Sequence, residues 1–329
     1  MKNSMHLVIV VDGNNKIGMG HVYRMINLTK ILRKRGHIVT FITKELKSKN
    51  FISKTNSCEF ITPTSLNKIK IFLEEFQPDV ILIDKFNETK KILQILKKSA
   101  PIIAIDYTGK NKDMIDFGIN ILYHDTGIQK NSISNFNNAI LDPQFLKYKK
   151  KKLSKNIREV LVLQGGADTH CFIPKIIKAL SSLEFDININ VVVGPAFRCW
   201  KQLQLSKSKS RKNVEIFHNV SNMPKLMKKS DLAISAGGNT LLELAYFGIP
   251  SLVICAEKFE EETANQMMKN GFGINAGFGK QLSIKQIQSH VVSILHNTKL
   301  QKNMNIIGPK LVDGKGISRI SGMLESIHN

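Results

Sequence analysis

The residues best suited to catalysis lie in a glycine-rich segment near the start of the chain. Gly18 and Gly20 precede His21, and Arg24 follows one helical turn later. Glycines let a backbone approach a ligand closely, and the positive end of a helix dipole favours the neutral form of an imidazole there. A general base requires that neutral form. We therefore interpret His21 as a candidate base that Asp12 could orient, with helix capping or packing by His21 as the alternative.

A second small-residue turn lies in the other half of the chain. Gly237 and Gly238 are followed by Asn239 or Thr240 as possible helix caps, and Glu243 comes one turn into the helix. Backbone N–H groups at such a turn can face a pyrophosphate, and the helix dipole adds favourable charge. Glu243 would be in reach of a ribose hydroxyl. The turn predicts a nucleotide diphosphate site, with an ordinary strand–turn–helix as the alternative.

Further polar residues complete the candidate site. Asn265 and Gln266 carry amides suited to binding sugar hydroxyls. Phe217 is the last residue of an expected strand, and we expect it to bind substrate. Four side chains that could ligate a metal come from three strand ends and lack the usual ligand spacing: Asp12, His21, Asp84 and Asp106. We therefore expect neither a metal ion nor a cofactor.

The elements that must position these residues alternate along the chain. Apolar runs rich in β-branched residues predict strands at Leu7–Val11, Ile38–Thr43, Val80–Asp84, Ile102–Asp106, Ile119–Tyr123, Val160–Leu163, Ile189–Val193, Val214–Phe217, Leu232–Ser235 and Ser251–Cys255. Between them, helices are predicted at His21–Arg35, Leu66–Phe76, Thr89–Lys98, Ile173–Leu183, Met223–Lys229, Thr240–Phe247, Glu261–Asn270 and Ile284–Leu295. Such alternation indicates parallel sheets covered on both faces.

This pattern predicts an α/β fold of two doubly wound, Rossmann-like domains facing a cleft. Residues 1–150 would form an N-terminal domain with the Gly-x-Gly-His motif, and residues 151–329 a C-terminal domain that binds a nucleotide sugar. The lysine-rich segment Lys147–Lys155 has no periodicity and is the expected linker. Ligands of doubly wound domains bind at the carboxyl ends of the strands.

The composition narrows the choice of function. The formal net charge is +22, but only seven of the 48 basic residues are arginine, which weakens the case for nucleic-acid recognition. Most lysines, including the stretch Lys201–Lys212, are expected to be solvated, to assist binding of an anionic substrate, or to assist peripheral association with an anionic membrane. No apolar run reaches the ~18 residues of a membrane span. Met1–Val11 resembles a first strand and not a signal peptide.

The cysteines indicate a reducing, cytoplasmic setting. Cys58, Cys171, Cys199 and Cys255 are widely spaced and contain no CxxC pair. We therefore expect buried free thiols and no disulfide scaffold or zinc ribbon.

Together these motifs resemble a known family. The run Ile17-Gly18-Met19-Gly20-His21-Val22-Tyr23-Arg24 is similar to the signature of the UDP-2,4-diacetamido-2,4,6-trideoxy-β-L-altropyranose hydrolases of pseudaminic acid biosynthesis, with their spore-coat polysaccharide relatives. A Gly165-Gly166 turn, the stretch Asp231–Leu252 and the Asn265-Gln266 pair also match. The wider superfamily has the glycosyltransferase-B architecture and includes family 28. The chain departs from the family pattern at Val10-Val11, Lys85-Phe86 and Tyr107.

The resemblance implies roles for several residues. His21 would activate water at the anomeric carbon, Glu243 would bind the ribose, and Asn265 with Gln266 would lie near the sugar. Asp84 and Asp106 would line the cleft. The implied function is an inverting, metal-independent hydrolase that releases UDP from a UDP-amino-sugar in nonulosonic acid or surface polysaccharide biosynthesis. An inverting glycosyltransferase is the first alternative, and a basic nucleic-acid-binding protein is the alternative of another class.

Overall fold

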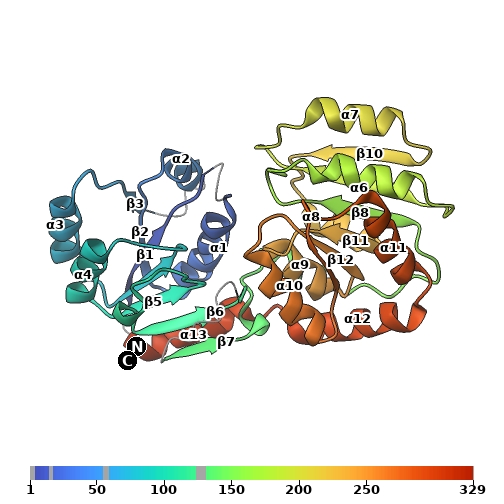
Figure 1. The fold of residues 1–329 in the computed structure, drawn as a ribbon. Coiled ribbons are helices and arrows are strands. Elements are labelled where there is room, and N and C mark those ends of the chain that lie inside the picture. Colours follow the sequence, from blue (N-terminus) through green and yellow to red (C-terminus); the bar gives the residue numbers. More distant parts are fainter. Residues whose placement is uncertain (1–3, 15–17, 55–58, 124–130, 329) are drawn as a thin grey trace. The chain divides into compact units, whose positions relative to one another are not determined.

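A computed structural model describes residues 4–14, 18–54, 59–123 and 131–328, without the side chains of residues 46, 47 and 54. Ile17 of the motif and Cys58 therefore lie outside the described residues. The chain forms two compact units (Figure 1): Met1–Asp142 with Gly314–Asn329, and Pro143–Asp313. We refer to them as unit 1 and unit 2.

Unit 1 is built on a seven-stranded parallel sheet. Its strand order is β3-β2-β1-β4-β5-β6-β7. The strands are β1 (His6–Val11), β2 (Ile38–Ile42), β3 (Glu59–Ile61), β4 (Val80–Asp84), β5 (Ile102–Ile105), β6 (Phe117–Asn120) and β7 (Ser132–Ser134). The chain runs outward from β1 to β3 and then returns to β4, so the topological switch lies between β1 and β4. Ligands of doubly wound sheets bind at such a point.

Helices cover both faces of this sheet. One face packs on α3 (Leu66–Phe76) and α4 (Lys90–Ser99), whose buried leucines and isoleucines meet Val8, Val10, Ile81 and Ile83. The other face carries α1 (Gly20–Lys34) and α13 (Gly316–His328), which contact each other. The remaining helices of the unit are α2 (Leu46–Lys54) and two 3-10 turns, η1 (Lys112–Met114) and η2 (Phe136–Asn138).

Unit 2 contains a six-stranded parallel sheet. Its order is β10-β9-β8-β11-β12-β13, and its switch point lies between β8 and β11. The strands are β8 (Glu159–Leu163), β9 (Asn188–Val193), β10 (Asn213–His218), β11 (Leu232–Ser235), β12 (Ser251–Cys255) and β13 (Ile274–Phe278).

The helices of unit 2 form a layer on each side of this sheet. Buried residues of α6 and α11 form one apolar core with Val160 and Val162 of β8, and α9 packs on β11 and β12 and against α12. The helices are α5 (Pro143–Leu146), α6 (Phe172–Ser181), α7 (Trp200–Ser208), α8 (Met223–Lys229), α9 (Asn239–Phe247), α10 (Glu260–Lys269), α11 (Ile284–Leu295) and α12 (Thr298–Leu311). The predicted class, two Rossmann-like parallel α/β domains, is confirmed.

The expected boundary at residue 150 differs from these units. The segment Lys147–Lys155 forms no helix or strand, but it is fastened within unit 2, where Lys151 Nζ lies 2.8 Å from Asp231 Oδ1. The chain also returns at its end, since Gly314–Asn329 belongs to unit 1 and contains α13 (Figure 1). Apolar residues of α13 are buried. In addition, α7 occupies much of the Lys201–Lys212 stretch. Among the described residues, no helix combines the length and apolarity needed to cross a membrane.

Candidate functional site

The Gly-x-Gly-His motif lies where β1 leads into α1. Gly18 has a φ of +78°, a conformation that side chains disfavour, and Met19 stands at the N-cap without a side-chain hydrogen bond to the helix. Gly20 is exposed and begins α1, followed by His21, which is 7% exposed. The motif therefore sets the histidine in the first turn of the helix, at the carboxyl edge of the sheet.

A carboxylate from a neighbouring strand fixes the His21 ring. His21 Nδ1 lies 2.6 Å from Oδ1 of Asp84, the last residue of β4. Burial alone would raise the pKa of Asp84, but the charges and hydrogen bonds of Arg24 and His21 lower it from 3.8 to about 2. Because Asp84 is ionised, Nδ1–H donates to it, and the lone pair of a neutral ring then lies on Nε2. Among the described residues, Nε2 has no hydrogen-bond partner.

Arg24 joins the two strand-end aspartates. Its Nε and Nη2 donate to the two oxygens of Asp84 at 2.7 and 2.6 Å, and Nη1 donates to Asp106 Oδ2 at 2.7 Å. Burial would lower the pKa of Arg24, but the two carboxylates raise it above its ordinary value. Asp106 Oδ1 in turn accepts from the backbone N–H groups of Ile121 and Leu122. The arginine, one turn after His21, thus uses each of its three nitrogens to hold the aspartates.

Asp12 does not contact the His21 ring in the way we expected. Its Oδ1 accepts from Thr43 Oγ1 and from the backbone N–H of Lys44, both at 2.9 Å. Its Oδ2 lies 2.6 Å from Lys85 Nζ, which also binds Glu88 at 2.6 Å. Local spacing suggested Asp12 because it shares a loop with His21, whereas the sheet order brings Asp84 closer. Asp12 supports the loop after β2.

The neighbours of His21 include an aromatic ring that sequence reasoning left without a role. Phe86 presents an edge-to-face contact to the His21 ring, with centroids 4.7 Å apart and planes at 84°. Lys85 and Glu88, which follow β4, form an ion pair, and Lys85 also pairs with Asp12. Among the described residues, no group of three or more histidine, cysteine or acidic side chains is arranged to hold a metal ion. The arrangement can accept a proton at His21 Nε2.

In unit 2, a carboxylate of the protein itself, that of Glu260, is hydrogen-bonded to the Gly237-Gly238 turn. The N–H of Gly237 donates to Glu260 Oε2 at 3.3 Å, and the N–H of Ala256 donates to the same atom at 2.7 Å. Glu260 is 9% exposed, and burial raises its pKa against the effect of these hydrogen bonds. A Cβ on Gly237 would come within 2.9 Å of Glu260. Only glycine allows this close approach of α10 to the turn.

The start of α9 differs from the predicted capping. Gly238 is the N-cap, and neither Asn239 nor Thr240 forms a side-chain cap; they are the first two residues of the helix and are partly exposed. Glu243 lies one turn further and is also partly exposed. The first-turn N–H groups of a helix have no acceptor within the helix. The positive end of the α9 dipole therefore lies at the carboxyl edge of the sheet.

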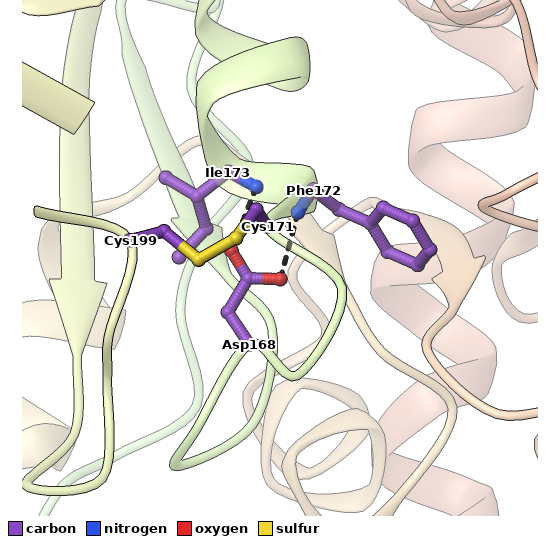
Figure 2. The surroundings of a disulfide bond; sticks show 5 residues. All are labelled: Asp168, Cys171, Phe172, Ile173 and Cys199. Atoms are coloured by element: carbon purple, nitrogen blue, oxygen red, sulfur yellow. Dashed lines mark hydrogen bonds between the residues drawn. A yellow bond between two sulfur atoms is a disulfide. The ribbon is translucent and has the colours of Figure 1, made fainter. Parts of the chain in front are cut away.

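The Gly165-Gly166 turn follows β8, the strand beside β11. Gly165 has a φ of +63°, and a Cβ on Gly166 would meet no atom within 4 Å. Figure 2 shows the end of this loop, where both oxygens of Asp168 accept from the first N–H groups of α6, those of Phe172 at 2.8 Å and Ile173 at 2.9 Å. Burial raises the pKa of Asp168 against these hydrogen bonds. The first N–H groups of α6 are thus engaged by the protein itself.

A disulfide replaces two of the expected free thiols. Cys171, at the N-cap of α6, is bonded to Cys199, at the N-cap of α7, with a Cα–Cα distance of 5.8 Å (Figure 2). The cysteines are 28 residues apart in sequence, but β8 and β9 are neighbouring strands, so their loops meet. The prediction of free thiols is therefore wrong for Cys171 and Cys199. Cys255 is a buried free thiol, and burial raises its pKa.

Gln164 is a candidate that sequence reasoning missed. It immediately precedes the Gly165-Gly166 turn and is 2% exposed, and neither amide atom has a hydrogen-bond partner among the described residues. A buried amide without partners is costly, which marks the position as unusual. A polar residue that directly follows the apolar strand β8 was the available signal.

The remaining predicted binding residues of unit 2 either have partners within the protein or lie away from the switch point of the sheet. Asn265 Oδ1 accepts from Asn275 Nδ2 at 2.8 Å, and Gln266 Nε2 donates to Glu262 at 2.7 Å, so both amides have partners on nearby elements. Phe217 lies on edge strand β10, two strands away from β8. The structure therefore groups Gly165, Gly166, the Gly237-Gly238 turn and the start of α9 at one switch point and leaves Phe217 apart.

Two Rossmann-like units with glycine-rich turns after their central strands define a protein of the glycosyltransferase-B architecture. The sequence model for "Glycosyltransferase family 28 C-terminal domain" matches residues 134–310. The chain belongs to this family.

Relatives extend the similarity to most of the chain. The chain is 30% identical over 286 residues to an uncharacterized protein of Methanocaldococcus jannaschii, covering 80% of this chain and 58% of that protein. It is 27% identical to the spore coat polysaccharide biosynthesis protein SpsG of Bacillus subtilis over 98% and 99% of the two chains. A Helicobacter pylori protein named pseudaminic acid cytidylyltransferase and UDP-2,4-diacetamido-2,4,6-trideoxy-β-L-altropyranose hydrolase is 23% identical over 91% of this chain. Of that protein's length, the chain spans 52%.

A solved structure shares the fold. The crystal structure of MurG from Acinetobacter baumannii superposes with a TM-score of 0.74 over 98% of this chain and 99% of that one. The sequence identity is 11%, so this likeness shows the fold alone.

Proposed function

We propose that this protein is a nucleotide-sugar hydrolase that releases UDP from a UDP-amino-sugar by inverting attack of water. The observation that carries the proposal is His21, whose Nδ1 is held by ionised Asp84 while Nε2 has no partner among the described residues. A base held in one tautomer is suited to deprotonating water. The Helicobacter pylori relative carries a hydrolase of this kind in its name.

Each step of the reaction has a proposed group. His21 Nε2 takes a proton from water, the oxygen bonds to the anomeric carbon, and the bond from that carbon to the diphosphate breaks. The diphosphate leaves with the bonding electrons and is stabilised by N–H groups at the start of α9, near Gly238 and Asn239. Since Glu260 already holds the Gly237 N–H, that donor is not assigned to the substrate. Glu243 is assigned to the ribose, and Asn265 with Gln266 to the sugar.

The other parts of the proposal concern the setting of the reaction. We assign UDP as the nucleotide and nonulosonic acid or surface polysaccharide biosynthesis as the pathway class, in keeping with the names of the two bacterial relatives. No metal ion is assigned to catalysis. Lysine-rich segments are assigned to peripheral contact with a membrane.

An inverting glycosyltransferase is the second candidate, which the match to the glycosyltransferase family 28 C-terminal domain favours. It would use the same His21 and the same leaving-group site, with an acceptor hydroxyl in place of water. UDP release that requires an added acceptor would select the transferase over the hydrolase.

The test of the proposal is the His21→Ala variant. We expect UDP release from UDP-amino-sugars without acceptor to fall by about 10²–10⁴-fold, the usual contribution of a general base. Binding of UDP, followed as a rise in melting temperature, should persist because the nucleotide is assigned to unit 2. His290→Ala, on α11, is the matched control and should keep full activity. Full activity of His21→Ala would refute the role of His21.

A further inference from the structure

Unit 2 has a groove between α6 and α7 that the proposed reaction does not use. Its volume is about 670 Å³, within the size range of ligand sites. Figure 1 shows α7 at the outer margin of this unit, and α7 contacts α6. The start of α11 closes one side through Ile284. The groove lies within one unit, so its shape depends only on packing inside that unit.

The rim of the groove is basic and its charges are not neutralised by the protein. Lys178, Lys209 and Arg211 are exposed, and their side chains have no hydrogen-bond or ion-pair partner in the part of the chain that the structure describes. Of the residues that the structure describes, none that lines the groove is acidic. A fourth cation, Lys175, donates to the carbonyl of Gly279 at 3.1 Å. Such a cluster attracts a phosphate group.

The surrounding sequence reinforces this charge. Residues 198–212 contain six basic residues and no aspartate or glutamate. The other lysine-rich segment differs, because Lys151 pairs with Asp231 and Lys150 donates to the carbonyl of Pro309. The structure therefore separates the two segments. Lys147–Lys155 engages Lys150 and Lys151 within unit 2, whereas residues 198–212 present Lys209 and Arg211 at the groove.

The groove is also lined by apolar side chains, which indicate what kind of phosphate-bearing molecule it would bind. Pro174, Leu205 and Ile284 line it, and Leu205 is 55% exposed. An exposed leucine among unpaired cations suits an amphiphile whose phosphate lies beside hydrocarbon. Nucleic acid fits less well, because none of the described residues that line the groove is aromatic and could stack on bases.

We propose that the α6–α7 groove binds headgroup phosphates of anionic phospholipids and docks this face of unit 2 on a bilayer. Lys178, Lys209 and Arg211 contact the phosphates, and Leu205 enters the interface between headgroups and acyl chains. The inference gives a defined surface to the proposed membrane contact. It holds equally for hydrolysis and for transfer, because no residue of the groove takes part in the reaction.

Vesicle flotation of the full chain tests the proposal. We expect binding to vesicles of phosphatidylcholine with phosphatidylglycerol, but not to vesicles of phosphatidylcholine alone. The variant Lys178→Glu, Lys209→Glu and Arg211→Glu should bind at least about 100-fold more weakly, at roughly 1 kcal/mol for each basic residue near the surface. Leu205→Gln should weaken binding further.

A matched control separates the groove from the net charge. Lys90, Lys91 and Lys98 of α4 are exposed and form no ion pair among the described residues, so their triple change to glutamate alters the net charge equally. Equal loss of vesicle binding in the two variants, or no binding by the wild type, would overturn the proposal. Groove-dependent binding of duplex DNA without vesicle binding would overturn it as well. UDP release in solution, measured on the same variants, reports separately on the proposed reaction.

Discussion

At the scale of single residues, the site in unit 1 depends on one arginine that serves two carboxylates. Arg24 binds the carboxylates of Asp84 and Asp106, which are at most 3% exposed. Buried ion pairs stabilise only when their hydrogen bonds are complete, and here every donor of Arg24 that faces the aspartates has an acceptor. Burying these charges costs free energy, but the buried Asp84 carboxylate fixes the orientation of the His21 imidazole.

Asp84→Asn should impair both activity and acid-dependent stability. Without a carboxylate at Nδ1, the ring of His21 is no longer held in one tautomer, and we expect turnover to fall roughly 100-fold with UDP binding unchanged. The folded-state pKa of Asp84 is about 2, below its ordinary 3.8, so its ionisation stabilises the protein above pH 3.8. That contribution is lost as the pH falls from 3.8 toward 2.

The measurement is the free energy of unfolding of both proteins as a function of pH. The difference between the wild type and Asp84→Asn should be largest near neutral pH and shrink below pH 3.8. Asp116→Asn is the control, because this exposed aspartate pairs with Lys97 at the protein surface. A difference that stays constant with pH would contradict the ionised state of Asp84.

At the scale of elements, a covalent link joins the starts of two helices at the carboxyl edge of the unit 2 sheet. The disulfide connects the N-caps of α6 and α7, and Asp168 holds the first N–H groups of α6. Cys171 and Asp168 both have positive φ angles, of 56° and 43°. A loop with two such residues needs strong local contacts, and the carboxylate and the disulfide supply them.

Thiol titration tests this link. In denaturant, the unreduced chain should show two thiols, Cys58 and Cys255, and the reduced chain four. The double variant Cys171→Ser and Cys199→Ser should lose about 3.5 kcal/mol of stability, as expected for a loop of this length. A reductant should lower the melting temperature of the wild type and leave that of the variant unchanged. Four thiols before reduction would disprove the disulfide.

The same scale shows what the sequence could predict. Buried strands β4, β11 and β12 and helices α3, α8 and α11 were predicted with their observed bounds, because their apolar periodicity is unbroken. Helix α7 was missed because its lysines suggested a solvated stretch, although Leu203 and Ser206 give it a buried face. Strand β7 was missed because three residues carry too little pattern.

The candidate site likewise contains a part that the sequence predicts and a part that it does not. His21 and Arg24 follow from local spacing on a helix, so they could be placed together from the sequence. The contact of His21 with Asp84 joins residues 63 positions apart and depends on β4 pairing with β1. The Glu260 carboxylate at Gly237 and the disulfide likewise depend on which loops meet. Contacts between loops require the sheet order, which periodicity does not contain.

At the scale of the whole molecule, the chain passes from unit 1 to unit 2 and then returns. Helix α13 packs on α1 and β4, and Arg319 Nη1 donates to the carbonyl of Asn137 at 2.7 Å. Gly316 at the start of α13 lies against the backbone of Asn138 and Ala139, where a Cβ would overlap. Unit 1 therefore depends on residues that follow unit 2.

Gly316→Ala should destabilise unit 1 selectively, by about 1–3 kcal/mol, because backbone atoms cannot move aside as a side chain can. Far-UV circular dichroism follows both units, whereas the fluorescence of Trp200, the single tryptophan, follows unit 2. We expect the first signal to gain an earlier transition and the second to stay unchanged. Gly322→Ala, on the same helix with no atom within 4 Å of the new Cβ, is the control. Equal shifts of both signals would contradict the selective effect.

The returning helix also sets an order for folding during synthesis. Unit 2 is one continuous stretch, complete once residue 313 has emerged from the ribosome, whereas unit 1 lacks α13 until later. Domains commonly fold in the order in which they are made. Here the unit that is made first is finished last, and until then the face that receives Ile317, Ile320 and Leu324 is open to chaperones in the nascent chain.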